Sequence, residues 1–322
     1  MPKKLGELFY IPPKNTNWHL DSIVNELKNV RQQWRDKYQQ GNYQNKRLLP
    51  SKENVGDIAD TLSKVLYPMR LGATDIKKEN EDYYVGYLLG NALERLAEEA
   101  TLELRYSTGE QPHPGDETPE AQEAINRIKQ FAARLPTIRK LLDSDILAAY
   151  QGDPSARSMD EVLLCYPGIH AVIHYRLAHE LYRLELPLLA RLMTEKAHSQ
   201  TGIDIHPGAQ IDEGFFIDHG TGVVIGETAI IGKHVRIYQA VTLGAKRFIT
   251  DADGNLQKRY PRHPIVEDDV VIYAGATLLG RITIGARSSI GGNVWLTRDT
   301  PPDSNIRQAS LLQSQFKDGD GI

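Results

Sequence analysis

The strongest constraint on the fold is a six-residue period that begins near residue 201. Small aliphatic residues occupy one strict series: Ile205, Ile211, Ile217, Val223, Ala229, Val235 and Val241. A second series lies two positions later: Ile225, Ile231, Ile237 and Leu243. Both resume further along, as Val270, Ala276, Ile282, Ser288 and Val294 and as Ile272, Leu278, Ile284 and Ile290. This period fits neither an amphipathic helix nor an alternating strand.

The period predicts a parallel β-helix, in which each unit forms one short strand and one turn and three units close a triangular rung. Glycine follows the second series at positions 226, 232, 244, 285 and 291, and we assign these glycines to tight corners that strain other residues. Residues 246–264 interrupt the period with charges and prolines. This indicates a loop extruded from a corner, a common place for function.

The chain before residue 200 spaces its apolar residues at three- and four-residue steps, which predicts helices. We expect them over 23–40, 58–71, 84–105, 120–142, 169–182 and 186–198. Thr118 suits an N-cap and Pro119 the first helical position. The fold class is α+β, an all-helical N-terminal domain followed by a C-terminal β-helix. The expected divisions are an extension (1–60), a helical domain (61–200), the β-helix (201–300, with loop 246–264) and a flexible tail (301–322).

Composition sets broad limits on function. The formal net charge of -4 argues against nucleic acid as the main partner. The sequence has no apolar run of membrane-spanning length and no apolar secretion signal, so we expect a cytoplasmic protein without a membrane span. The single cysteine, Cys165, cannot supply an intrachain disulfide or a cysteine-rich metal site, and its apolar neighbours predict burial.

Several strings are more specific than the repeat. They are DIHPGAQI (204–211), IDHGTGVVIGETA (217–229), VTLGA (241–245), PRHP (261–264) and VIYAGATLLGRITIGA (271–286), preceded by DPSA (153–156) and GIHAVIHYRLAHELY (168–182). With these strings the sequence resembles the serine acetyltransferase family of hexapeptide acyltransferases over roughly residues 150–300. The resemblance implies a left-handed β-helix that transfers acetyl from acetyl-CoA to L-serine, the first step of cysteine biosynthesis.

The resemblance places the general base at His219 and the group that orients it at Asp204. A serine hydroxyl needs a base, and the ordinary pKa of histidine lies near neutrality. A carboxylate partner would fix the imidazole tautomer. The two residues are 15 positions apart in rungs of about 18, so we expect them on adjacent rungs near one corner. A corner histidine that merely caps a turn is the competing interpretation.

L-Serine is a zwitterion, so its site needs a cation for the carboxylate and anions for the ammonium group. The resemblance implies Arg262 and His263 for the carboxylate, Asp218 and Asp153 for the ammonium group, and Glu227 as a supporting residue. As alternatives, Asp153 would be a turn residue, and Arg262 and Glu227 would be solvated surface charges.

The resemblance also implies direct transfer from acetyl-CoA without an acyl-enzyme, in a groove between β-helices of a homotrimer or a dimer of trimers. Residues matching the family's coenzyme contacts are Gly244, Ala245, Ala274, Gly275 and Gly292. The sequence departs from the family at Tyr273, where glycine is usual, and in residues 303–314. No metal is expected.

The chain ends QFKDGDGI, whose composition alone is typical of a disordered terminus. The family often ends in an acidic, glycine-containing segment with a final isoleucine that enters the active site of O-acetylserine sulfhydrylase. The resemblance therefore implies this enzyme as a partner through Ile322. It also implies L-cysteine as a feedback inhibitor at the serine site.

Three other functions remain open. An acyltransferase for another acceptor, such as a sugar, would share the fold and a corner histidine. A γ-type carbonic anhydrase would need three zinc-binding histidines. The candidates, which lack that family's spacing, are His206, His219, His234 and His263. A non-catalytic partner of the sulfhydrylase would need only the tail.

Overall fold

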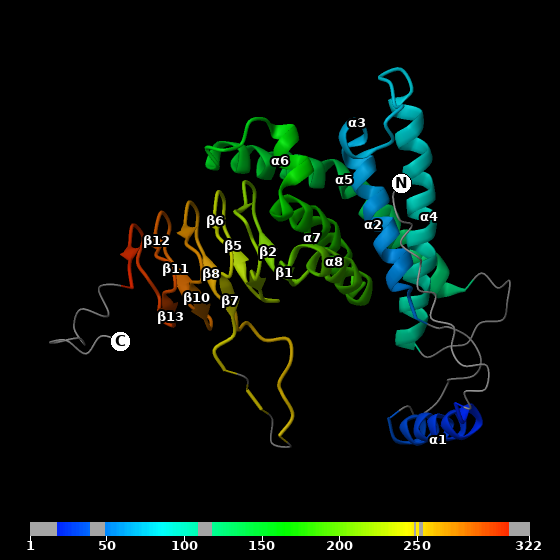
Figure 1. Cartoon of the computed structure of the whole chain (residues 1–322). Coiled ribbons are helices and arrows are strands. Elements are labelled where there is room, and N and C mark those ends of the chain that lie inside the picture. Colours follow the sequence, from blue (N-terminus) through cyan, green and yellow to red (C-terminus); the bar gives the residue numbers. More distant parts are fainter. Residues whose placement is uncertain (1–17, 39–48, 109–117, 248, 251–253, 309–322) are drawn as a thin grey trace, which may run out of the picture. The chain divides into compact units, whose positions relative to one another are not determined.

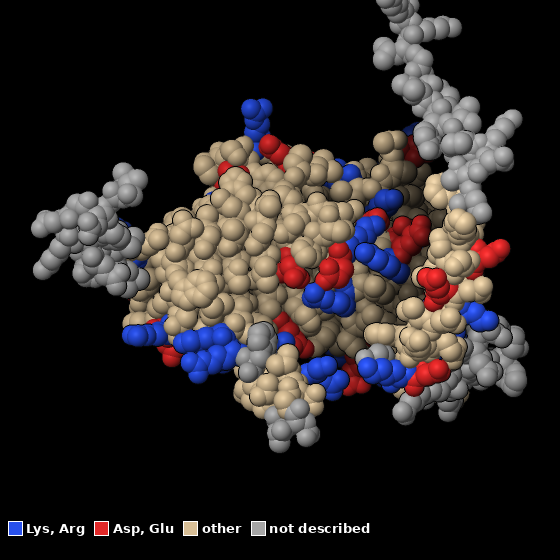
Figure 2. All heavy atoms as spheres, turned by 60° about the horizontal axis from the view of Figure 1, so that its bottom comes forward, with Lys and Arg blue, Asp and Glu red and all other residues tan. Residues whose placement is uncertain are grey.

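A computed structural model describes residues 18–38, 49–108, 118–247, 249–250 and 254–308 (Figure 1). The chain divides into two compact units, Met1–Arg47 and Leu48–Ile322, which are described separately. The described element of the first unit is helix α1 (Leu20–Tyr38). Among the described helices, none is both long enough and apolar enough to cross a membrane. On the face shown in Figure 2, charged side chains of both signs are interspersed with large uncharged areas.

The described helices of the second unit precede the β-helix. They are α2 (Lys52–Leu66), α3 (Pro68–Leu71), α4 (Glu81–Thr108), α5 (Pro119–Gly152), α6 (Met159–Cys165), α7 (Pro167–Arg183) and α8 (Pro187–Thr201). Every expected helical range contains a helix, and Thr118 caps α5 by accepting a hydrogen bond from Ala121 N at 3.3 Å. Helix α2 crosses the expected boundary at residue 60, because Glu99 of α4 accepts a hydrogen bond from Ser51 N at 2.6 Å and fixes the start of α2.

Helix α6 was not predicted, because seven residues are too few to show a helical period. It carries the single cysteine, which lies on the surface, so the prediction that Cys165 is buried was wrong. The buried side chains of α6 are Val162 and Leu163. A short surface helix buries one face only, and Cys165 lies outside that face.

The rest of the unit is a left-handed parallel β-helix with one sheet on each face of a triangular prism. Sheet A contains β1 (Asp204–Ile205), β4 (Val224–Ile225), β7 (Thr242–Gly244), β10 (Thr277–Leu279) and β13 (Trp295–Leu296). Sheet B contains β2 (Gln210–Ile211), β5 (Ile230–Ile231), β8 (Ile265–Val266) and β11 (Thr283–Ile284). Sheet C contains β3 (Phe216–Ile217), β6 (Arg236–Ile237), β9 (Val271–Ile272), β12 (Ser289–Ile290) and β14 (Asn305–Ile306).

Two corners of this prism carry most of the residues singled out by the sequence. At the C–A corner the chain passes from sheet C to sheet A, through residues 218–223, 238–241, 273–276 and 291–294. At the A–B corner it passes from sheet A to sheet B, through residues 206–209, 226–229, 245–264 and 280–282. The loop 246–264 thus leaves the A–B corner, where the break in the period placed it, and extends away from the prism (Figure 1).

The first aliphatic series is not continuous in the structure. Ile205 pairs with Ile225, twenty residues on, whereas Ile225 pairs with Leu243, eighteen residues on. The first rung therefore has two extra residues, which lie between Ile217 and Ile225 at the C–A corner. The two series are also offset by two residues. Because of the insertion, Ile205, Ile211 and Ile217 occupy the structural positions of the second series, although their spacing in the sequence places them in the first. This insertion contains His219.

The glycines that follow the second series do not have the left-handed backbone predicted for them. At the corners, left-handed φ angles belong to other residues, including His219 (61°) and Ala240 (58°). Close packing between rungs explains Gly226 instead, because a Cβ added there would lie 2.1 Å from the ring of His263.

A buried ion pair joins helices α5 and α7 to the first rung. Arg176 Nε lies 2.6 Å from Asp145 Oδ2, and both side chains are almost fully buried. Asp145 also accepts a hydrogen bond from Phe215 N, and Arg176 donates to the carbonyl oxygens of Ile211 and Asp212. These bonds satisfy charges that would be costly to bury unpaired.

Candidate active site

His219 lies in the two-residue insertion at the C–A corner. Its side chain is 72% exposed, and its Nε2 lies 3.7 Å from Asp218 Oδ1, within ion-pair range but beyond hydrogen-bond distance. Holding a non-glycine residue in the left-handed region costs on the order of 1–3 kcal/mol. Here that conformation presents an accessible imidazole beside a carboxylate, which suits a group that exchanges protons with a substrate.

Asp218 is nearly buried and is held by Arg236 from the next rung. Arg236 Nη2 donates to Asp218 Oδ2, while Nη1 donates to the carbonyl oxygen of Gly152 at 2.7 Å. The guanidinium also lies 4.7 Å from the centre of the Tyr238 ring. Arg236 therefore connects the end of α5 to the corner that carries His219.

Asp153 follows directly after α5. Its Oδ2 accepts a hydrogen bond from the Tyr166 hydroxyl at 2.5 Å, and its Oδ1 accepts two from Ser155 at 2.8 Å. The Tyr166 hydroxyl is the main cause that lowers the pKa of Asp153 below its ordinary value. Asp153 is thus a turn residue, the role considered as an alternative. It also keeps a charged carboxylate next to Gly152, whose carbonyl oxygen Arg236 binds.

Asp204 makes no hydrogen bond or ion pair with His219 in the described part of the chain. Its ion-pair partner is Arg191 of α8, at 3.7 Å. Gly222 N donates to the carbonyl oxygen of Gly202 at 2.8 Å, which places the insertion directly above the segment that enters β1. His219 and Asp204 therefore lie on adjacent rungs, as expected, without direct contact.

Arg262 and Glu227 form an ion pair at the A–B corner, with 2.7 Å between Nη2 and Oε2. The Tyr182 hydroxyl donates to the other oxygen of Glu227 at 3.0 Å. Burial alone would raise the pKa of Glu227, but the hydrogen bonds from Arg262 and Tyr182 lower it below its ordinary value. Neither residue is an isolated solvated charge. A cleft of about 340 Å³, lined in part by Glu227 and Tyr260, lies beside them.

The ring of His263 is buried next to this ion pair. Thr228 N donates to Nδ1 at 3.0 Å, so the neutral ring carries its proton on Nε2. Burial first, and then the charge of Arg262, lowers the pKa of His263 to about 4. His263 is therefore a neutral hydrogen-bond donor at physiological pH, next to a permanent cation.

The predicted serine-binding residues thus form two groups that do not touch in one described chain. Asp218 and His219 belong to the C–A corner, and Asp153 follows Gly152, whose carbonyl oxygen Arg236 binds. Arg262 and His263 belong to the A–B corner. Both corners border sheet A, so a whole face of the prism separates the anionic group from the cationic group.

The residues expected to line the coenzyme groove are also divided. Gly244 is the last residue of β7, and Ala245 begins the A–B corner, where the long loop starts. The others lie at the C–A corner on later rungs than His219: Ala274, Gly275 and Gly292. Gly275 has a φ of 73°, and an added Cβ would lie 2.2 Å from the amide oxygen of Asn293, so this position requires glycine.

Tyr273, the departure from the family pattern, stacks on Tyr238 with ring centroids 5.2 Å apart. Strand register places Asp218, Tyr238 and Tyr273 at the same position of successive rungs. The substitution therefore extends a wall of aromatic rings along the C–A corner, beginning beside Asp218.

The four candidate zinc-binding histidines are not gathered in the part of the chain that the structure describes. His219 lies at the C–A corner, His206 and His263 lie at the A–B corner, and His234 pairs with Asp269 at 3.4 Å. The one described group whose ligand atoms lie within 4.8 Å of one another contains none of them: Glu195, His198 and Asp204.

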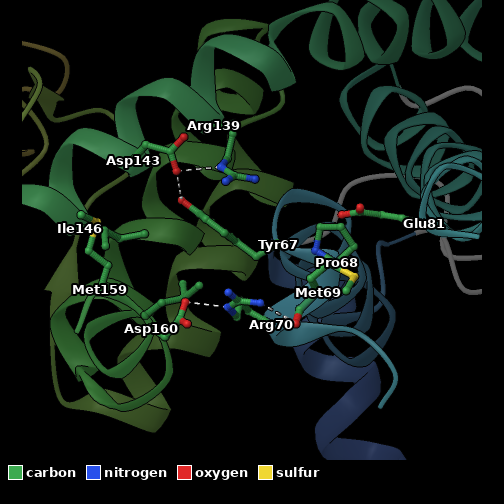
Figure 3. Close-up of a pocket in the computed structure, with 11 residues that line it drawn as sticks. Tyr67, Pro68, Met69, Arg70, Glu81, Arg139, Asp143, Ile146, Met159 and Asp160 are labelled. Carbon is green, nitrogen blue, oxygen red and sulfur yellow. Dashed lines mark hydrogen bonds and ion pairs between the residues drawn. The ribbon is translucent and has the colours of Figure 1, made fainter. Parts of the chain in front are cut away.

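A separate cleft of about 500 Å³ lies among the helices (Figure 3). Asp143 accepts hydrogen bonds from Arg139 at 2.8 Å and from the Tyr67 hydroxyl at 3.1 Å, and Arg70 pairs with Asp160 at 2.6 Å. None of the site residues predicted from the sequence lines this cleft. Ile322 lies outside the described residues.

Sequence reasoning missed the side chains that hold the predicted ones in place: Tyr166, Arg191, Thr228 and Arg236. The sequence did contain a signal for Arg236, because this charged residue stands directly before Ile237 of the second aliphatic series. Tyr166 and Arg191 belong to the helical half, and no local pattern shows where that half contacts the β-helix.

Comparisons with known proteins give one consistent result, although no family model matches the chain. A Synechococcus elongatus protein named serine acetyltransferase, plasmid, is 54% identical over 280 residues, covering 85% of this chain and 86% of its own. A Bacillus subtilis serine acetyltransferase is 44% identical over 167 residues, 52% of this chain and 73% of its own. The crystal structure of serine acetyltransferase 1 from Entamoeba histolytica in complex with L-cysteine has a TM-score of 0.68 and 34% identity, covering 89% of this chain and 99% of that chain.

Proposed function

The chain belongs to the serine acetyltransferase family, and on that premise we propose that it transfers the acetyl group of acetyl-CoA to the hydroxyl of L-serine. The observation that carries this proposal is the exposed imidazole of His219 beside the nearly buried carboxylate of Asp218. An acceptor bound at this corner through its ammonium group would present its hydroxyl to the imidazole.

In this mechanism His219 removes the hydroxyl proton while the serine oxygen attacks the thioester carbonyl. A carbon–oxygen bond forms, the tetrahedral oxyanion collapses, the carbon–sulfur bond breaks, and the imidazolium returns the proton to the CoA thiolate. Asp204, one rung below, would stabilise the imidazolium after the exposed ring turns toward β1. The exposed Cys165 takes no part, so transfer is direct.

The charge arrangement suits both ends of an amino acid, but on different corners. Asp218 and Asp153 would bind the ammonium group, while Arg262 and the Nε2 proton of His263 would bind the carboxylate. We therefore propose a homotrimer, single or paired, in which the C–A corner of one copy meets the A–B corner of the next. Each interface would then hold one complete site.

Acetyl-CoA would occupy the groove between neighbouring copies, along the C–A corner. Gly275 and Gly292 are partly exposed glycines of this corner and would contact the coenzyme, and the Tyr238–Tyr273 wall would bound the groove. The residues at its other edge, Gly244 and Ala245, would come from the neighbouring copy.

L-Cysteine would compete for the same site, because it differs from L-serine only in carrying a thiol in place of the hydroxyl. The Entamoeba relative with bound L-cysteine supports this proposal. We also propose that Ile322 inserts into O-acetylserine sulfhydrylase and that the enzyme works in the cytoplasm, where both proteins would meet.

The test is CoA release from acetyl-CoA with acceptors that lack one charge. L-Serine should be used well, whereas ethanolamine, without the carboxylate, and 3-hydroxypropionate, without the ammonium group, should each lose at least about tenfold in kcat/KM. A sugar acceptor used faster than L-serine would assign the chain to the competing acyltransferase class.

A further inference from the structure

Helix α1 carries a heptad pattern that the proposed reaction does not use. Leu20, Leu27 and Trp34 fall at the first position (a) of successive heptads, and Ile23 and Val30 fall at the fourth (d). Apolar residues at a and d form the seam by which α-helices wind around one another. Lys37, at the next d position, ends the seam within this helix.

Four side chains of the seam are exposed in the described part of the chain. Leu20 is 62% exposed and Val30 is 61% exposed, and Ile23 and Leu27 are exposed as well. A solitary helix of this length is marginal in water, because most helical stability comes from packing an apolar face. The exposed seam therefore indicates a partner for α1.

The charges beside the seam favour another copy of the same helix, aligned in parallel. Glu26 lies at position g and Arg31 at position e of the next heptad, five residues later. In parallel coiled coils a g side chain meets the e side chain five residues on in its neighbour, so these two would pair across the seam. The polar face mixes Asp21, Lys28 and Asp36, unlike the basic face of helices that bind anionic membranes.

We propose that α1 is an oligomerisation helix that forms a parallel coiled coil with α1 of other copies. Leucine at a with β-branched residues at d favours three or four strands over two. Three helices match the proposed trimer. Only this choice of three over four rests on the proposed function. The seam is short, but covalent attachment to the assembling part of the chain would raise the local concentration of α1.

Site-specific crosslinking of the full chain tests this proposal. In a Cys165→Ser background, Val30→Cys places a thiol at d in the seam, and Asn25→Cys places one at f on the outside. A short bis-maleimide should link Val30→Cys chains at least about tenfold more than Asn25→Cys chains, because f positions lie roughly 20 Å apart across the bundle. Equal yields at the two positions, or no linkage at either, would overturn the proposal.

A charge exchange supplies the second arm. In the Val30→Cys chain, Glu26→Lys should reduce linkage and Glu26→Lys with Arg31→Glu should restore it, because only the double variant keeps opposite charges across a parallel seam. A double variant that links no better than the single one would contradict parallel pairing. Binding of the wild-type chain to vesicles of anionic or zwitterionic lipid would assign the seam to membranes instead.

Discussion

At the scale of single residues, the hydrogen bonds of His263 decide what the ring can offer a substrate. Thr228 occupies Nδ1 and leaves the Nε2 proton as a donor, while the adjacent Arg262 supplies the positive charge. A neutral donor beside a cation binds a carboxylate without placing two like charges side by side. In the proposed site, this pair would therefore hold the carboxylate over a wide pH range.

His263 should make stability fall as the pH falls. Its pKa is about 4 in the folded chain and 6.5 ordinarily, so below pH 6.5 the unfolded chain takes up a proton that the folded chain does not. Stability should drop by up to about 1.4 kcal/mol per pH unit from pH 6.5 down to about 4. The His263→Asn variant, which keeps an acceptor for Thr228 N, should lose this part of the pH dependence of the urea midpoint. Parallel curves for the two proteins would contradict the assignment.

The sequence predicted candidate site residues but not the hydrogen bonds that those residues make. Arg262 and His263 could be predicted as a pair because they are adjacent in the RHP string. Thr228, thirty-five residues from His263, sets its tautomer only because the loop returns the chain to the same corner. Contacts of that kind depend on the rung geometry, which a local string does not contain.

At the scale of elements, the junction between helices and β-helix depends on the Arg176–Asp145 pair. Arg176→Met would leave Asp145 buried without its partner, which should cost about 3–5 kcal/mol of unfolding free energy in urea titration. Arg183→Met on the same helix removes an exposed arginine and should cost less than about 1 kcal/mol. Similar losses for both variants would show that the buried pair is not what fixes the junction.

The elements also show how far a period predicts a fold. The six-residue repeat predicted the β-helix and the position of its loop, because each core position recurs with the rung. The repeat did not predict the corner that contains His219. Two extra residues there make Ile205 pair with Ile225, which belongs to the other aliphatic series. The proposed general base lies where the repeat is broken, and a strict repeat cannot predict the geometry of its own interruption.

At the scale of the whole molecule, the two half-sites on opposite edges of sheet A imply that activity requires assembly. His219→Asn and Arg262→Ala chains should each be inactive alone. When they are co-expressed and assort at random, about one interface in four would combine an intact C–A corner with an intact A–B corner. CoA release by the mixed trimers should therefore recover to about a quarter of the wild-type rate.

The matched control is co-expression of His219→Asn with Asp218→Asn, which damage the same corner. No interface between these chains has an intact C–A corner, so this mixture should stay inactive. Failure of the first mixture to recover, or equal recovery of both mixtures, would contradict a site shared between copies.

The central claim is that His219 is the general base for acetyl transfer to L-serine. The most direct measurement compares serine-dependent CoA release by the wild type and by His219→Asn, because asparagine tolerates the left-handed backbone at this corner. The account predicts a wild type that releases CoA only with L-serine, and a folded variant whose kcat is lower by about 10²–10⁴-fold. A wild type without serine-dependent release, or a variant within about tenfold of it, would contradict the claim.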